Sequence, residues 1–151
     1  MSRKVLLWCD EETTVQTLSS VLGELKVHVD CCESAEEAER LLAEERFDAV
    51  IVELNESNPQ ASDVLQRARK SSLNRSTLAI TVVGTSVNVR DIFGLGANFL
   101  LYQPVSAERA RASLRAAYAL MGRERRRKVR LPAHTKATID YAGLEWARNR
   151  G

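Results

Sequence analysis

The sequence predicts an α/β fold, in which a parallel β-sheet is covered by helices on both faces. Five short apolar runs alternate with stretches in which apolar residues recur at helical spacing. The runs are apolar almost throughout, which is typical of parallel strands buried on both faces. Because a helix follows each predicted strand, the chain can return before the next strand begins. We therefore expect a doubly wound, five-stranded parallel sheet.

The first half of the chain contains three strand–helix units. Apolar residues after Thr13 recur three or four positions apart, as one face of a helix requires. Ser34 is followed three positions later by Glu37, a capping box that predicts a helix start. The expected elements are strands at Lys4–Cys9, Lys26–Cys31 and Phe47–Val52 and helices at Thr13–Leu25, Ser34–Glu45 and Ser62–Ser71.

The second half supplies the remaining two units. Gly84 ends an apolar run, and Gly94 and Gly96 follow a short helical pattern. Ser106 is expected to cap a long helix that continues past Met121 into a basic segment. The expected elements are strands at Leu78–Val83 and Asn98–Tyr102 and helices at Val87–Leu95 and from Ser106 onward.

The charge is distributed unevenly along the chain. Residues 122–130 hold six basic groups and one acid, a local charge of +5, although the whole chain carries only +2. Leu131-Pro132 should end the long helix, and Thr135–Tyr141 alternates like a single extra strand. We therefore predict a domain over residues 1–121 and a basic linker with a truncated second module over residues 122–151.

The cysteines and the apolar runs exclude several classes of protein. Three cysteines, two of them adjacent at Cys31-Cys32, do not form a disulfide framework or a zinc-binding spacing. No apolar run approaches the roughly 20 residues that a membrane-spanning helix needs. A signal peptide is not expected either, and the predicted location is the cytoplasm.

Three stretches, in this order and spacing, resemble the receiver domain of bacterial response regulators. Val5–Glu11 resembles the family's first strand and the acidic residues after it. Phe47–Glu53 resembles the strand that ends in the phosphoacceptor aspartate, and Leu95–Pro104 resembles the stretch that ends in Lys-Pro. The resemblance covers about residues 3–121. It implies a flavodoxin-like (βα)5 fold and a role in two-component signal transduction or a phosphorelay.

The residues that carry the family's chemistry are changed. Receivers hold Mg²⁺ with two adjacent carboxylates and the acceptor aspartate, but here the corresponding positions are Cys9, Asp10 and Glu53. Glu11 is a less suitable substitute for the missing carboxylate. A thiol is a poor ligand for Mg²⁺, and Glu53 carries its carboxylate one methylene further out than aspartate does. A bound Mg²⁺ is therefore not expected.

Two further receiver positions lie at the ends of the fourth and fifth strands. The register of Gly84 assigns the family's hydroxyl position to Val83, with Thr81 as the alternative. The family's lysine is replaced by Gln103, while Pro104 is retained. Without that lysine no cation balances a phosphoryl charge. The sequence leaves three interpretations of Glu53 open: a capping or solvated carboxylate, an imitation of the phosphorylated side chain, or a vestige of the scaffold.

The basic segment has a second, shorter resemblance. Arg125–Pro132 is similar to the entry of a PilZ domain, a family that binds cyclic di-GMP through an Arg-x-x-x-Arg motif. The resemblance implies ligand-binding roles for Arg126, Arg127 and Arg130. The family's second motif, Asp/Asn-x-Ser-x-x-Gly, does not occur, so cyclic di-GMP binding is expected only with a complete downstream domain. The remaining interpretations of the run are a solvated helix end and non-specific contact with nucleic acid.

Together these patterns predict a non-enzymatic pseudo-receiver in a bacterial regulator. We expect it to act by association with itself, as a homodimer, or with other signalling proteins, without a membrane span or specific nucleic-acid recognition. The dimer face would combine the fourth helix, the fifth strand and the last helix. The alternatives are a phosphorylatable response regulator and a small-ligand-binding module at the carboxyl ends of the strands.

Overall fold

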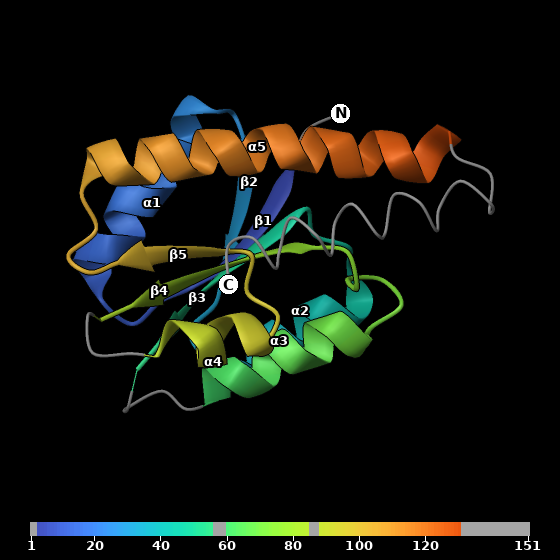
Figure 1. The fold of residues 1–151 in the computed structure, drawn as a ribbon, viewed down its shortest axis with the longest axis horizontal. Helices are drawn as coiled ribbons and strands as arrows, with labels where there is room; N and C mark the ends of the chain where they lie inside the picture. Colours follow the sequence, from blue (N-terminus) through green and yellow to red (C-terminus); the bar gives the residue numbers. More distant parts are fainter. Residues whose placement is uncertain (1–2, 56–59, 85–87, 131–151) are drawn as a thin grey trace.

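The computed structural model describes residues 3–55, 60–84 and 88–130, with backbone alone for residue 89 and residues 124–130. Five parallel strands form one sheet in the order β2-β1-β3-β4-β5, so β3 is central (Figure 1). The predicted α/β class and doubly wound sheet are confirmed. In chain order the elements are β1 Lys4–Trp8, α1 Glu12–Glu24, β2 His28–Cys31, α2 Ala35–Glu44, β3 Ala49–Leu54, α3 Gln60–Lys70, β4 Leu78–Val83, α4 Val89–Gly94, β5 Phe99–Tyr102 and α5 Ala107–Arg130.

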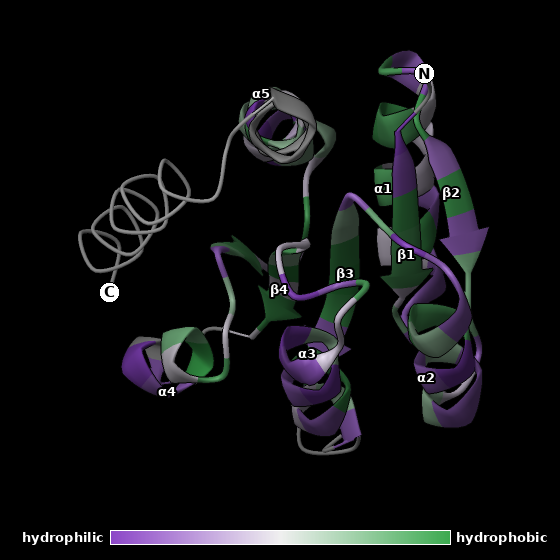
Figure 2. Ribbon diagram, turned by 90° about the vertical axis from the view of Figure 1, so that its right-hand side faces the viewer, coloured by the Kyte–Doolittle hydropathy of each residue, from purple (hydrophilic) through white to green (hydrophobic). Residues whose placement is uncertain are grey.

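The sheet separates two apolar layers. On one face the side chains of α1 and α5 pack on alternate strand residues such as Leu7 and Ile51. On the other face α2 and α3 pack on the intervening residues, which include Trp8 and Val52. In Figure 2 hydrophilic residues are frequent in α2 and α3, and of the strands β2 at the sheet edge is largely hydrophilic. This alternation decides which face each strand-end side chain reaches.

Two helix starts follow from the caps expected in the sequence. The Ser34 hydroxyl accepts a hydrogen bond from the Glu37 amide at 3.2 Å, and α2 begins at the next residue. The Ser106 hydroxyl accepts one from the Arg109 amide at 3.2 Å at the start of α5. The inner stripe of α5 is buried against the sheet, and it comprises Ala110, Leu114, Ala117 and Met121.

The predicted bounds of two strands were wrong by two residues. β2 begins at His28 and not at Lys26, because Lys26 adopts a left-handed conformation with φ +60° in the turn after α1. β3 begins at Ala49 and continues through Glu53 to Leu54. Phe47 lies before it and donates its amide to the Asn74 side chain at 2.8 Å. Glu53 is thus a residue of the central strand and does not merely follow it.

Two polar side chains tie loops to the sheet across long sequence distances. Asn74 is buried and donates to the carbonyl oxygens of Leu42 and Glu45 at 2.7 and 2.8 Å. Arg69, on α3, donates to the carbonyl oxygens of Gly96 and Thr77. These bonds hold the loops at the amino ends of β3, β4 and β5.

Candidate functional site

The candidate site lies at the carboxyl edge of the sheet, where β1 and β3 end beside the start of α1. Glu53 pairs in register with Val82 of β4, whose side chain belongs to the apolar layer under α1 and α5. Residues paired in register on parallel strands share a face, so Glu53 points to the α1 side. Only 4% of Glu53 is exposed. Its carboxylate is thus buried among protein groups.

The Glu53 carboxylate is held by donors from two segments. Oε1 accepts the backbone amides of Asp10 and Glu11 at 3.0 and 3.2 Å, and Oε2 accepts the Asn55 side-chain amide at 2.8 Å. Asp10 and Glu11 lie directly before α1, whose N-cap residue Glu11 makes no side-chain cap bond of its own. Backbone amides here carry the positive end of the helix dipole, which favours an anion. Glu53 therefore serves the α1 entrance as a capping carboxylate supplied from another strand.

Cys9 lies beside this carboxylate and is also buried. Burial, together with the nearby Glu53 and Asp10 carboxylates, raises the pKa of the Cys9 thiol far above its ordinary value. The thiol therefore stays protonated at neutral pH and is not a nucleophile there. The position matched to a receiver's first carboxylate thus contributes a neutral, apolar group to the layer under α1.

The structure does not bring the two hydroxyl candidates to Glu53. Val83 is fully buried and packs with Ile92 of α4 and with Ala97. Thr81 is paired in register with Val52, so its side chain points to the α3 face, away from Glu53. Neither residue lies on the face that the Glu53 side chain occupies.

Gln103 and Pro104 follow β5 directly. The Gln103 backbone amide donates to the Val83 carbonyl at 2.8 Å, and the Gln103-Pro104 peptide bond is cis. Gln103 is half-buried and Pro104 is exposed. The uncharged amide of Gln103 leaves the edge without the cation that the receiver lysine supplies.

The edge offers no metal site among the residues that the structure describes. Asp10 is exposed, while Glu53 is engaged by backbone amides. Within the described ranges, no three His, Cys, Asp or Glu side chains are grouped so that they could hold an ion. Two carboxylates without a third oxygen ligand leave Mg²⁺ mostly to water.

The ligand-binding residues predicted in the basic segment are placed only in part. Arg126, Arg127 and Arg130 belong to α5, whose backbone runs through residues 122–130 without a break. Their side chains lie outside the described residues, as does the strand predicted at Thr135–Tyr141. Their proposed contacts with a dinucleotide thus remain a prediction.

Sequence reasoning missed Asn55. It follows β3 by one residue and was assigned to a loop, yet its amide fixes one oxygen of Glu53. The only local signal was an amide two positions after a buried carboxylate.

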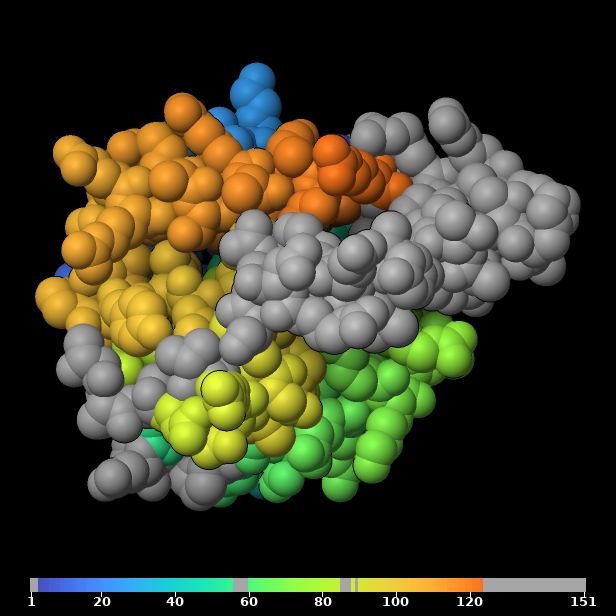
Figure 3. Space-filling view, in the orientation of Figure 1, coloured from blue at the N-terminus to red at the C-terminus, as the bar shows by residue number. Residues whose placement is uncertain are grey.

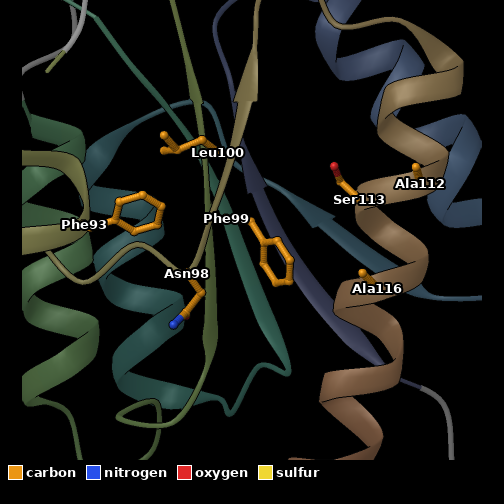
Figure 4. Close-up of a pocket in the computed structure, with 7 residues that line it drawn as sticks. All are labelled: Phe93, Asn98, Phe99, Leu100, Ala112, Ser113 and Ala116. Atoms are coloured by element: carbon orange, nitrogen blue, oxygen red, sulfur yellow. The ribbon is translucent and has the colours of Figure 1, made fainter. Parts of the chain in front are cut away.

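A separate hollow lies between α4, β5 and α5. The pocket has a volume of about 300 Å³, and Phe93 and Phe99 approach it from opposite sides of β5 (Figure 4). Small residues of α5 form the other wall. The lining residues are Phe93, Asn98, Phe99, Leu100, Ala112, Ser113 and Ala116.

Several solved structures similar to this chain are receiver domains. Vibrio cholerae chemotaxis response regulator CheY4 matches with a TM-score of 0.69 and 21% identity, over 78% of this chain and 99% of that one. A CheY-like receiver domain protein from Methanospirillum hungatei matches with a TM-score of 0.70 and 17% identity, over 82% and 99%. This chain has the receiver fold. No protein-family model and no curated protein matches the sequence.

A third similar structure has a site of a different kind. The receiver domain of the sensor histidine kinase PA1611 from Pseudomonas aeruginosa matches with a TM-score of 0.67 and 16% identity, over 81% of this chain and 99% of that one. That protein coordinates a magnesium ion in its active-site cleft. In the present chain Glu53 accepts the amides of Asp10 and Glu11 at the carboxyl edge of the sheet.

No helix in the described part of the chain is long and apolar enough to span a membrane.

Proposed function

We propose that this domain is a non-catalytic signal-transduction module that acts by association and has lost phosphoacceptor chemistry. The observation that carries the proposal is the buried Glu53 carboxylate, engaged by the amides of Asp10 and Glu11 and by Asn55. A phosphoacceptor must present a free oxygen in line with the donor. Both carboxylate oxygens of Glu53 instead accept hydrogen bonds from the protein.

The surroundings support the same conclusion. Phosphoryl transfer needs a hard cation held by oxygen ligands and a positive group that balances the transferred charge. Cys9 supplies a protonated thiol and Gln103 supplies a neutral amide. The domain would therefore keep the fold that partners bind while remaining independent of a phosphoryl donor.

Intact mass spectrometry tests the loss of chemistry. After incubation with acetyl phosphate and Mg²⁺, the mass of the protein should not change, and a phosphorylatable receiver treated in parallel should gain one phosphoryl group. A labile gain on this chain that disappears in both Glu53→Gln and Asp10→Asn would overturn the proposal. Calorimetry with millimolar Mg²⁺ should likewise show no saturable binding.

The association surface we propose is the face formed by α4, β5 and α5. Its hollow is lined by the rings of Phe93 and Phe99 beside Ala112 and Ala116, which are exposed small residues of α5 and allow a second helix to approach closely. The same face on a second copy would bury both hollows in an isologous homodimer. The basic ends of the two α5 helices would repel each other, so association should strengthen as salt screens them.

Sedimentation at several salt concentrations tests the dimer. Ala116→Arg should shift the protein to monomer, because it places a large charged side chain in the hollow. Ala43→Arg, on the exposed surface of α2 across the sheet, is the matched control and should leave association unchanged. A protein that is monomeric at tens of micromolar in every salt would contradict self-association and leave a different signalling protein as the partner.

We further propose that residues 122–151 begin a PilZ-like output module of a cytoplasmic bacterial regulator. The Arg-x-x-x-Arg spacing of Arg126 and Arg130 supports this, because guanidinium groups bind phosphates in pairs and stack on bases. The 151-residue chain should bind cyclic di-GMP poorly, since these residues do not contain the family's second motif, Asp/Asn-x-Ser-x-x-Gly. A longer protein containing the whole downstream module should bind it tightly, and Arg126→Ala with Arg130→Ala should abolish that binding. Failure of the longer protein to bind would overturn the proposed module.

A further inference from the structure

Helix α5 concentrates the positive charge of the molecule. Its 24 residues contain nine arginines and lysines and two glutamates, a net charge of +7. Since the whole chain carries +2, the other residues together carry about −5. One helix is thus strongly basic on an acidic body.

The exposed surface of α5 displays this charge. The inner stripe of the helix is buried against the sheet, while Arg109, Arg115 and Arg123 are exposed. Arg111 is not part of this set, because its guanidinium pairs with Glu24 of α1 at 2.9 Å. Ala112 and Ala116 lie exposed between the arginines. The solvent side of α5 therefore combines guanidinium groups with side chains too small to keep a partner away.

The helix also continues beyond the body. Met121 is the last buried residue of the inner stripe, and the helix runs on to Arg130. At 1.5 Å per residue this adds roughly 13 Å of helix. Figure 1 shows this part of α5 extending past the ends of the strands, and in Figure 3 the helix lies along the surface next to β5. Helical spacing places positions 127 and 130 in line with position 123.

We propose that α5 is a sequence-independent binding helix for double-stranded nucleic acid. Its arginines would contact backbone phosphates, and its alanines would let the helix approach a groove about 12 Å wide. Described exposed side chains of α5 offer no array of amides that would read base edges, so sequence selectivity is not part of the inference. An anionic membrane fits less well, because the apolar stripe of α5 is already buried on the sheet and cannot enter lipid. This interaction goes beyond the proposed signalling role, and it would compete with the proposed homodimer for Ala112 and Ala116.

The test is fluorescence anisotropy with a labelled 20-base-pair duplex of random sequence and the whole 151-residue chain. The triple variant Arg109→Gln, Arg115→Gln, Arg123→Gln should bind at least roughly tenfold more weakly at low salt. The slope of log affinity against log salt should become shallower by about 2.7, which is three lost phosphate contacts. Circular dichroism should show that this variant is folded.

The matched control removes the same charge from elsewhere. Arg40→Gln, Arg67→Gln and Arg75→Gln change three exposed arginines outside α5, and this variant should retain the wild-type affinity and salt slope. Equal loss of affinity in both triple variants would show that binding depends only on net charge, and it would overturn the inference. An α5 variant that binds the duplex as tightly as the wild type would also overturn it. The same holds if the chain binds phosphatidylserine vesicles tightly and does not bind the duplex.

Discussion

Glu53 uses its length to join the central strand to the first helix. Its carboxylate accepts from the amides of Asp10 and Glu11, groups that would otherwise remain unsatisfied at a helix start. Asn55 fixes the second oxygen. The residue that gives the edge its resemblance to a phosphorylation site therefore contributes to the stability of the fold.

Replacing this charge should lower the free energy of unfolding. Glu53→Gln keeps one carbonyl oxygen but loses the charge-assisted bonds, and it turns an amide donor toward other donors, for a cost of about 1–3 kcal/mol. Urea denaturation measures this loss in the free energy of unfolding. Glu33→Gln, at an exposed position, should stay within about 0.5 kcal/mol of the wild type. A Glu53→Gln variant as stable as this control would show that the capping role is wrong.

The three cysteines should differ sharply in reactivity. Cys31 is exposed, whereas Cys9 and Cys32 are buried. Burial, and to a smaller extent the nearby Glu37 carboxylate, raises the pKa of Cys32 to about 12. At pH 8 iodoacetamide should modify Cys31 alone, and the other two only in denaturant. Rapid modification of all three in the folded protein would contradict this assignment.

The raised pKa of Cys32 makes the free energy of unfolding depend on pH. The Cys32 pKa is higher in the folded state than its ordinary value of 9.0, so the unfolded state loses its thiol proton first. Stability should therefore be unaffected by this group below about pH 9 and should fall as pH rises from there toward 12. Cys32→Ser should fall less steeply over that range, as urea midpoints at several pH values would show.

At the scale of elements, Arg69 joins α3 to the entries of β4 and β5. Its guanidinium donates to the Gly96 carbonyl at 2.7 Å, to the Asn98 side chain at 2.7 Å and to the Thr77 carbonyl. Gly96 has φ +105°, and a Cβ there would lie 3.0 Å from the Arg69 side chain. Glycine thus provides both the turn and the space that the guanidinium needs.

Losing this junction should destabilise the domain. Arg69→Lys keeps the charge but cannot reproduce several bonds in one plane, so we expect a loss of about 2–3 kcal/mol. Arg67, on the same helix, makes a surface ion pair with Glu39. Arg67→Lys should therefore lower the free energy of unfolding by less than about 0.5 kcal/mol. Gly96→Ala should also destabilise, and its effect should not add to that of Arg69→Lys in a double-mutant cycle. Additive effects would mean that the two residues act independently.

For the whole molecule, the body should be stable without the end of α5. Met121 and Gly122 are the last buried residues among those whose side chains are described. A chain that stops after Arg123 should therefore keep the urea midpoint and its slope, because it retains every described buried residue. A lower midpoint would show that residues beyond 123 contact the body.

The same shortened chain should bind duplex more weakly, since it lacks five of the nine basic residues of α5.

The local pattern of the sequence determined the elements and their order. Three local signals predicted the ten elements to within two residues of their observed bounds: caps at Ser34 and Ser106, apolar runs of strand length, and helical spacing. These signals act between near neighbours. β3 is displaced by two residues at both ends, and β2 begins two residues late because Lys26 forms a left-handed turn without a glycine. The sequence also placed Glu53 at the carboxyl end of a buried strand.

What Glu53 does there was decided only by the tertiary structure. Its partners Asp10 and Glu11 are more than 40 positions away, and strand pairing alone brings them within hydrogen-bond distance. The same pairing turns Thr81 to the opposite face of the sheet. The sequence shows which residue types could form a site. The direction of a side chain in a sheet depends on the strand register, and the register depends on packing across the whole domain.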